Sequence, residues 1–246
     1  MRRGWPLAKF GGSVFALVTL VMGCASQDPR AKLKTVSVGQ YQAELVERGI
    51  WSGGAEYKFE DVGRGTLATA IELGLMPEHK VLDIGAGSLR VGWWFLHFIE
   101  PSNYYAIEPV RERIHTAIEI LGVDDIHVFY NMDFKFPPVD FDFVIARSIW
   151  THASKDMITT MLAEFAENST PDAKFLTSVK LAETPDQEYW GTEWVGRINA
   201  DDQPAVVFHS SDWMEREAAK YGLKVEVLGD LTNQTWVVVS RDQEVE

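Results

Sequence analysis

Two glycines and two carboxylates stand at the ends of apolar stretches, where they could bind a nucleotide-like ligand. The stretch VLDIGAGS, residues 81–88, contains Asp83, Gly85 and Gly87. Glycine has no side chain, so the backbone can turn tightly at these positions and approach a ligand closely. Glu108 ends the next apolar stretch, where a carboxylate can accept hydrogen bonds from both hydroxyls of a ribose. The pattern G-x-G alone is also typical of plain turns, and a surface position is the alternative for Glu108.

A second group of candidate side chains lies in the segment RSIWTHAS, residues 147–154. An imidazole titrates near neutral pH, so His152 is the candidate general base. The alternative role for His152 is a hydrogen bond to the backbone near the start of the next helix. Arg147 and Trp150 are candidates for substrate contact, and packing explains Trp150 equally well.

The segment from residue 181 to residue 210 is the third candidate region, and it contains Tyr189, Trp190 and Trp194. Connections of this length are usually functional or disordered, and aromatic residues argue against disorder because they favour burial. We expect this segment, together with residues 51–59, to roof a substrate pocket. A dimer contact is the alternative.

Alternating strands and helices must position these side chains. Short apolar runs predict strands at residues 80–85, 103–109, 126–131, 141–148 and 174–179. Helices are expected between them, at residues 89–99, 110–121 and 155–168. An earlier helix is expected to present one apolar face made of Leu67, Ala70, Ile71 and Leu75. Strands that are apolar on both faces and separated by helices indicate a parallel sheet covered on both sides.

The C-terminal part of the chain departs from this alternation. Residues 211–222 predict a helix capped by Ser211 or Asp212, and two strands follow, joined through residues 229–234. Strands joined without a helix form an antiparallel hairpin. The sequence therefore predicts an α/β fold with a doubly wound, mostly parallel seven-stranded sheet that ends in a C-terminal antiparallel hairpin.

The motifs VLDIGAGS, YYAIEP, NMDF and FDFVIARSIWTH together resemble the class I, Rossmann-like methyltransferases that use S-adenosylmethionine, over about residues 41–242. The resemblance implies that Asp83 lies near the methionine end of the cofactor, which Gly85 and Gly87 line. It also implies roles for three further residues, with the ribose held by Glu108, the adenine amine met by Asp133 and the adenine ring flanked by Phe134. The loop after the fourth strand would then face the transferred methyl group.

Asp83 argues against a nicotinamide cofactor at this loop. A carboxylate before the first glycine repels a pyrophosphate, whereas it attracts the ammonium of methionine. Arg90 also stands where the dinucleotide pattern G-x-G-x-x-G has its third glycine. Arg90 could pair with the methionine carboxylate or cap a surface.

Composition and charge exclude other classes of protein. The 246 residues include 36 acidic residues against 23 Lys and Arg, for a net charge of −13. Because a nucleic acid would be repelled by such a surface and no basic run offsets it, we expect no nucleic-acid partner. A single cysteine and histidines without ligand spacing predict no metal site.

The N-terminus resembles a bacterial lipoprotein signal. Arg2, Arg3 and Lys9 precede an uncharged run that ends at Cys24. We expect a signal peptide or membrane anchor over residues 1–23, a lipid on Cys24 and a linker to residue 40. A translation start at Met22 is the alternative, which would leave the protein cytoplasmic.

These observations lead to an expected function with two alternatives. The first expectation is S-adenosylmethionine-dependent methyl transfer to an unidentified small molecule. The second is a membrane-tethered, inactive binding or scaffold protein, because S-adenosylmethionine is made in the cytoplasm and a lipoprotein signal exports its passenger. The third is a nicotinamide-dependent reductase. The acceptor atom and the oligomeric state remain unassigned.

Overall fold

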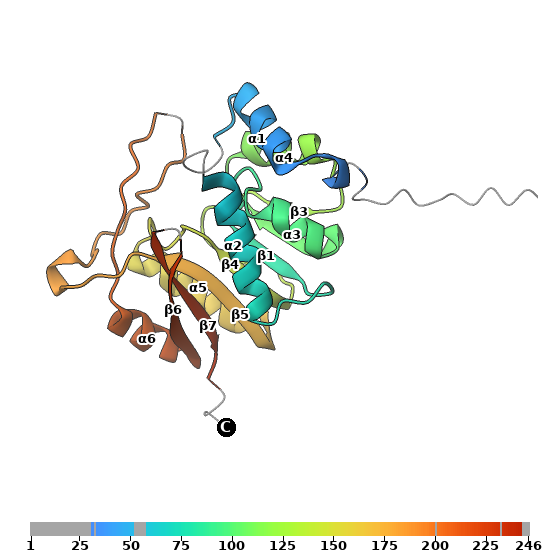
Figure 1. Ribbon diagram of the computed structural model, residues 1–246. Coiled ribbons are helices and arrows are strands. Elements are labelled where there is room, and N and C mark those ends of the chain that lie inside the picture. The colour runs from blue at the N-terminus through green and yellow to red at the C-terminus, as the bar shows by residue number, and fades with distance from the viewer. Residues whose placement is uncertain (1–30, 32, 52–57, 200, 232, 243–246) are drawn as a thin grey trace, which may run out of the picture.

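A seven-stranded sheet forms the centre of the molecule (Figure 1). The computed structural model describes residues 31, 33–51, 58–199, 201–231 and 233–242. The strand order is β3-β2-β1-β4-β5-β7-β6. The strands are β1 (Val81–Ile84), β2 (Tyr104–Ile107), β3 (His127–Phe129), β4 (Phe141–Ala146), β5 (Ser169–Val179), β6 (Leu223–Leu231) and β7 (Gln234–Arg241). Pairings among β1 to β5 are parallel, and β7 pairs antiparallel with both β5 and β6. The predicted fold class is confirmed.

The order of the strands creates one switch point. β1 pairs with β2 on one side and with β4 on the other, so the chain reverses its direction of progress across the sheet there. Loops that leave the carboxyl ends of such neighbouring strands diverge to opposite faces and leave a crevice, where open α/β sheets bind ligands. The candidate residues after β1, β2 and β4 therefore meet at one edge.

Helices cover both faces of the sheet. The helices are α1 (Val38–Glu47), α2 (Phe59–Glu72), α3 (Gly92–Phe98), α4 (Arg111–Leu121), α5 (Lys155–Glu167) and α6 (Ser211–Ala219). Successive residues of β1 belong to different apolar clusters, because neighbouring side chains of a strand point to opposite faces of the sheet. Val81 packs in the cluster with α1 to α4, and Leu82 packs in the cluster with α5 and α6.

The N-terminal boundary of the domain lies earlier than the sequence pattern predicts. Leu33 is fully buried, and α1 begins at Val38, inside the segment predicted as a linker. Ser37 caps α1 in a reciprocal capping box with Gln40. Residues 33–40 are therefore part of the packed domain.

Three local predictions are wrong in detail. Ala70 of the predicted face of α2 is buried as expected, but Ile71 is 43% exposed. The buried face instead continues through Phe59, Val62 and Thr66. The cap of α6 is Ser210, whose hydroxyl accepts from the Trp213 amide, rather than Ser211 or Asp212. The hairpin strands extend to residue 231 and from residue 234, so Gly229 lies at a register shift within β6 rather than in the turn.

The predicted signal segment, Cys24 and residues 52–57 of the predicted roof lie outside the described residues. Among the helices that the structure describes, none is long and apolar enough to cross a membrane. Within the same part of the chain, no group of three or more His, Cys, Asp or Glu side chains could hold a metal ion.

Candidate cofactor and substrate site

A cavity of about 470 Å³ lies at the carboxyl ends of β1, β2 and β4. Its wall comes from the ends of β1 and β2, from the loops after β1 to β4, and from the following residues elsewhere in the chain: Trp51, Lys58, Arg113, Trp194, Arg197, Ile198, Pro204, Asn233 and Gln234. The structure brings eight of the predicted site residues together there: Asp83, Gly85, Gly87, Glu108, Phe134, Arg147, His152 and Trp194.

Both glycines of the β1 loop adopt the left-handed conformation that the G-x-G pattern suggests. Gly85 has φ +72° and Gly87 has φ +58°. A Cβ atom on Gly85 would stand 2.3 Å from Cδ1 of Ile149, so the loops after β1 and β4 approach closely at this point. Glycine therefore serves here both the turn and the close packing of two loops.

Glu108 joins the β1 and β2 loops through its carboxylate. Its Oε2 accepts from the Gly87 amide at 2.9 Å, and its Oε1 accepts from the Val110 amide at 2.9 Å. Burial raises the pKa of Glu108, while these amides and Arg113, whose Nη1 lies 3.7 Å from Oε1, lower it in part. A carboxylate offers about four lone-pair positions, so both oxygens retain capacity for ligand hydroxyls.

Asp83 is a buried carboxylate in the wall of the cavity. It is 2% exposed, and its Oδ2 accepts from the Tyr104 hydroxyl at 2.5 Å. Burial raises the pKa of Asp83 to about 7, and Glu108 adds to the rise, while the Tyr104 hydrogen bond opposes it. A cation beside Asp83 would favour its ionised form. Tyr41 of α1 donates to the Ser88 carbonyl and so ties α1 to the same loop.

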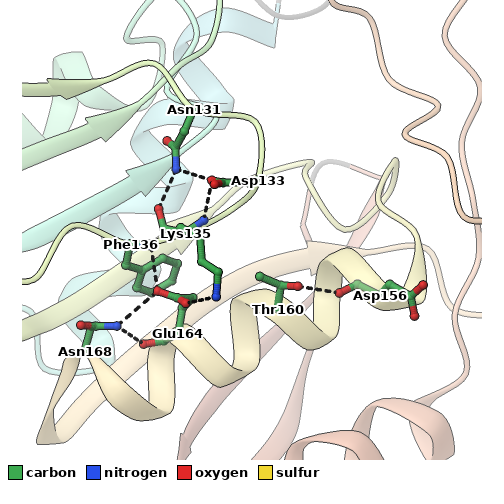
Figure 2. Close-up of polar contacts among 8 residues, drawn as sticks. All are labelled: Asn131, Asp133, Lys135, Phe136, Asp156, Thr160, Glu164 and Asn168. Atoms are coloured by element: carbon green, nitrogen blue, oxygen red, sulfur yellow. Dashed lines mark hydrogen bonds and ion pairs between the residues drawn. The ribbon is translucent and has the colours of Figure 1, made fainter.

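The structure does not bring Asp133 into the wall of the cavity. Its Oδ1 accepts from Asn131 Nδ2 at 2.6 Å and from the Lys135 amide at 3.1 Å (Figure 2). Asp133 thus closes the turn after β3, because an Asx side chain replaces a backbone acceptor there. The residues of this turn that line the cavity are Asn131, Met132 and Phe134.

The turn after β3 is anchored to α5 through Glu164. Lys135 Nζ lies 2.6 Å from Oε1 of Glu164, and the Phe136 amide donates to Oε2 at 2.9 Å (Figure 2). Glu164 is 7% exposed, so its charge is compensated in a largely dry position. Phe134, with φ +58°, is thereby held at the cavity by a supported turn.

His152 is oriented by the backbone of the long segment. Its Nδ1 lies 2.7 Å from the Ala205 carbonyl, which can only accept, so Nδ1 carries the proton of the neutral ring. Nε2 is then the basic nitrogen. Burial lowers the pKa of His152, and the charge of Arg147 lowers it further, against the effect of the Ala205 bond. This lowered pKa favours the neutral ring, whose Nε2 can accept a proton.

Residues 181–210 dock against the domain through backbone hydrogen bonds. The Val195 amide donates to the His152 carbonyl at 3.0 Å, and the Val207 amide donates to the Thr151 carbonyl at 2.9 Å. Arg113 Nη2 donates to the Ile198 carbonyl at 2.6 Å. These bonds bring Trp194, Arg197, Ile198 and Pro204 to the cavity.

The other predicted aromatic contacts lie away from the cavity. Trp150 is fully buried and packs edge-on against Phe175, with ring centroids 5.7 Å apart, so packing explains it. Trp190 is 72% exposed, and its ring centroid lies 3.4 Å from Lys155 Nζ. Tyr189 donates to the Glu193 carbonyl within its own loop.

Two residues of the wall, Arg90 and Trp51, are held by contacts that the sequence does not predict. Arg90, left open between two roles, is 7% exposed, and its Nη2 donates to the Lys58 carbonyl at 2.5 Å. Trp51 contacts the guanidinium groups of Arg113 and Arg197, at 5.2 and 5.3 Å from its ring centroid. These contacts join distant parts of the chain and leave no local pattern.

Neither a protein-family model nor a curated protein matches the sequence. Solved structures resemble it in fold. The glycopeptide N-methyltransferase MtfA with S-adenosyl-L-methionine has 17% identity and a TM-score of 0.54, covering 74% of this chain and 94% of that chain. DesVI of Streptomyces venezuelae has 16% identity and a TM-score of 0.54, covering 75% and 96%. An S-adenosylmethionine-dependent methyltransferase of Clostridium acetobutylicum has 9% identity and a TM-score of 0.57, covering 82% and 97%. The chain therefore has the fold of S-adenosylmethionine-dependent methyltransferases.

Proposed function

We propose that the protein transfers a methyl group from S-adenosylmethionine to a small molecule. The observation that carries this proposal is the convergence of Asp83, Gly85, Gly87 and Glu108 on one cavity at the switch point of the sheet. The neighbours in fold include a methyltransferase crystallised with S-adenosyl-L-methionine, which supports the same cofactor here.

The residues of the cavity fit this cofactor chemically. Asp83 suits the methionine ammonium, and the remaining lone pairs of Glu108 suit the ribose hydroxyls. Arg90 is the cation of the β1 loop that would meet the methionine carboxylate. Phe134 offers an apolar surface for the adenine ring. A pyrophosphate would instead face the Asp83 carboxylate, which disfavours a nicotinamide cofactor.

When bound, S-adenosylmethionine supplies a methyl group already activated on a sulfonium. The protein then needs to align the acceptor and, where the acceptor carries a proton, to remove it. Nε2 of His152 is the group for this step, because the Ala205 carbonyl keeps the proton on Nδ1. The docked segment brings Trp194 and Ile198 to the wall of the same space.

Calorimetric titration with S-adenosylmethionine and with NAD tests the cofactor. We expect S-adenosylmethionine to bind and NAD not to bind. Binding of NAD without S-adenosylmethionine would establish the reductase alternative. Binding of neither would leave the scaffold alternative.

The lipid anchor on Cys24 remains a separate proposal from the sequence. The full chain expressed in a bacterium should incorporate radiolabelled palmitate and sediment with membranes, and Cys24→Ser should abolish both. Protein that stays in the supernatant with an N-terminus at Met22 would instead favour the cytoplasmic alternative.

A further inference from the structure

The wall of the cavity is cationic in an otherwise acidic protein. Among the residues that the structure describes, five Lys and Arg side chains line it: Lys58, Arg90, Arg113, Arg147 and Arg197. The same described residues contribute two carboxylates to the wall, Asp83 and Glu108, while the whole chain has a net charge of −13. Local charge of this sign attracts and binds anions.

Two of the arginines already have partners in the domain. Arg113 faces Glu108 and donates to the Ile198 carbonyl. Arg90 donates to the Lys58 carbonyl and lies over the ring of Phe59, with its central carbon 5.6 Å from the centroid. The proposed methionine carboxylate would add a counter-charge at Arg90.

Arg147 differs from these two, because it has no carboxylate partner among the residues that the structure describes. Its Nε is buried and donates to no acceptor within those residues. Burial lowers the pKa of Arg147 to about 10, which reflects the cost of holding the charge there. The charged or titratable groups that face it include Arg90 and His152, neither of which neutralises a cation.

Arg197 extends this cationic region from the long segment. Its Nε is also buried and unpartnered among the described residues, and its guanidinium lies beside the Trp51 ring. A guanidinium presents a planar fork of N–H donors that matches a carboxylate or a phosphate in two-pronged geometry. The charge of Arg197 interacts with the Asp202 carboxylate, whereas removal of the Arg147 charge from water is unfavourable unless a further anion compensates it.

We infer that the methyl acceptor is a small anion whose carboxylate or phosphate is bound by Arg147, with Arg197 as the second cation. This inference rests on the proposed function, which places the cofactor against Asp83, Gly87 and Glu108. With its anionic group bound by Arg147, the acceptor would lie beside Nε2 of His152. Trp194, whose ring centroid lies 6.0 Å from that of Phe134, provides an apolar surface for the body of the acceptor, while Phe134 itself stays with the adenine ring.

A binding experiment on protein saturated with S-adenosylhomocysteine tests the inference. The carboxylate of S-adenosylhomocysteine then already pairs with Arg90, so an added anion is left to bind at Arg147. The anionic probes are 4-hydroxybenzoate and phenyl phosphate, and the neutral probe is 4-hydroxybenzamide. Calorimetry should detect binding of at least one anion and much weaker binding of the amide. Arg147→Gln should weaken anion binding about tenfold or more, as expected for a lost charged hydrogen bond. The two anions distinguish a carboxylate from a phosphate acceptor.

Arg64→Gln is the matched control, since it removes the same charge from an exposed position on α2. It should leave anion binding unchanged. Equal binding of anion and amide, unchanged binding in Arg147→Gln, or no binding of either anion at millimolar concentration would each overturn the inference. Weaker S-adenosylhomocysteine binding in Arg147→Gln, with anion binding retained, would also overturn it by assigning Arg147 to the cofactor. Failure of S-adenosylhomocysteine to bind wild-type protein would overturn the proposed function itself.

Discussion

The cavity has two walls that are built in different ways. The glycine wall (Asp83, Gly85, Gly87 and Glu108) lies at the carboxyl ends of β1 and β2. Its two carboxylates accept hydrogen bonds from the Gly87 amide, the Val110 amide and the Tyr104 hydroxyl. The cationic wall (Arg147, His152, Trp194 and Arg197) joins the β4 loop to the long segment. Nε of Arg147 and of Arg197 has no hydrogen-bond partner there among the described residues.

This difference suggests a division of labour. A wall whose polar atoms are already bonded is rigid and needs little reorganisation when a ligand arrives. Arg147, by contrast, has no carboxylate partner among the described residues, and a ligand of opposite sign would compensate its charge. The glycine wall would therefore set the affinity for the cofactor, and the cationic wall would set the choice of acceptor and the rate.

The largest expected effect lies in the cationic wall. His152→Ala should lower kcat by about 10²- to 10⁴-fold, the usual range for loss of a general base. Cofactor affinity should stay nearly unchanged. The measurement is S-adenosylhomocysteine formation with the first acceptor found, and the control is His115→Ala, an exposed histidine bonded to Tyr130.

The pH profile sharpens this prediction. Because the pKa of His152 is lowered below 6.5, its neutral form is present throughout the neutral range. Wild-type kcat should rise as the pH increases through the lowered pKa of His152 and should then stay level. The rising limb should be absent in the His152→Ala variant. A loss of thermal stability with an unchanged rate would assign His152 to structure.

The second effect concerns the stability of the glycine wall. The folded-state pKa of Asp83 is about 7, above the ordinary value of 3.8 that applies after unfolding. Its contribution to stability is therefore complete below pH 4 and is lost as pH rises toward 7, by up to about 4 kcal/mol. Asp83→Asn should remove this slope, which urea unfolding at several pH values would measure. An identical slope in the variant would contradict the assignment, and its S-adenosylmethionine binding should be weaker.

The third effect separates the walls by cofactor affinity. Glu108→Ala should weaken S-adenosylmethionine binding by about 10- to 100-fold, because hydrogen bonds to a charged group contribute roughly 1.5–3 kcal/mol. Glu108→Gln should be milder, since one acceptor oxygen remains. Glu112→Ala, an exposed acid in the first turn of α4, is the control for charge. Equal affinities in the wild type and all three variants would show that Glu108 does not bind the ribose.

The two walls were not equally predictable from sequence. The glycine wall follows from short motifs, because strands in a parallel sheet bring consecutive loops to one edge. Asp133 lies outside the cavity wall because its carboxylate accepts hydrogen bonds from Asn131 and Lys135 within the turn, and a sequence motif does not reveal those bonds. Arg197 reaches the cavity through backbone bonds between segments far apart in the chain. Such contacts depend on the whole fold.

The smallest expected effect tests the contact between the two walls at Gly85. Gly85→Ala forces a side chain into the left-handed conformation at φ +72°, which costs about 1–2 kcal/mol. Its Cβ would also meet Cδ1 of Ile149, the flexible end of a side chain that can move aside. We therefore expect a melting temperature lower by about 2–4 °C for each kcal/mol lost.

Gly222→Ala is the matched control, because Gly222 has φ +66°, a Cβ there would meet nothing within 4 Å, and the residue is not part of the cavity wall. Both variants should lose similar stability, since the backbone strain is alike. Only Gly85→Ala should also weaken S-adenosylmethionine binding, because a displaced Ile149 intrudes between the two walls. Equal affinities in the two variants would show that the walls act independently at this contact, and that the glycine is needed for the turn alone.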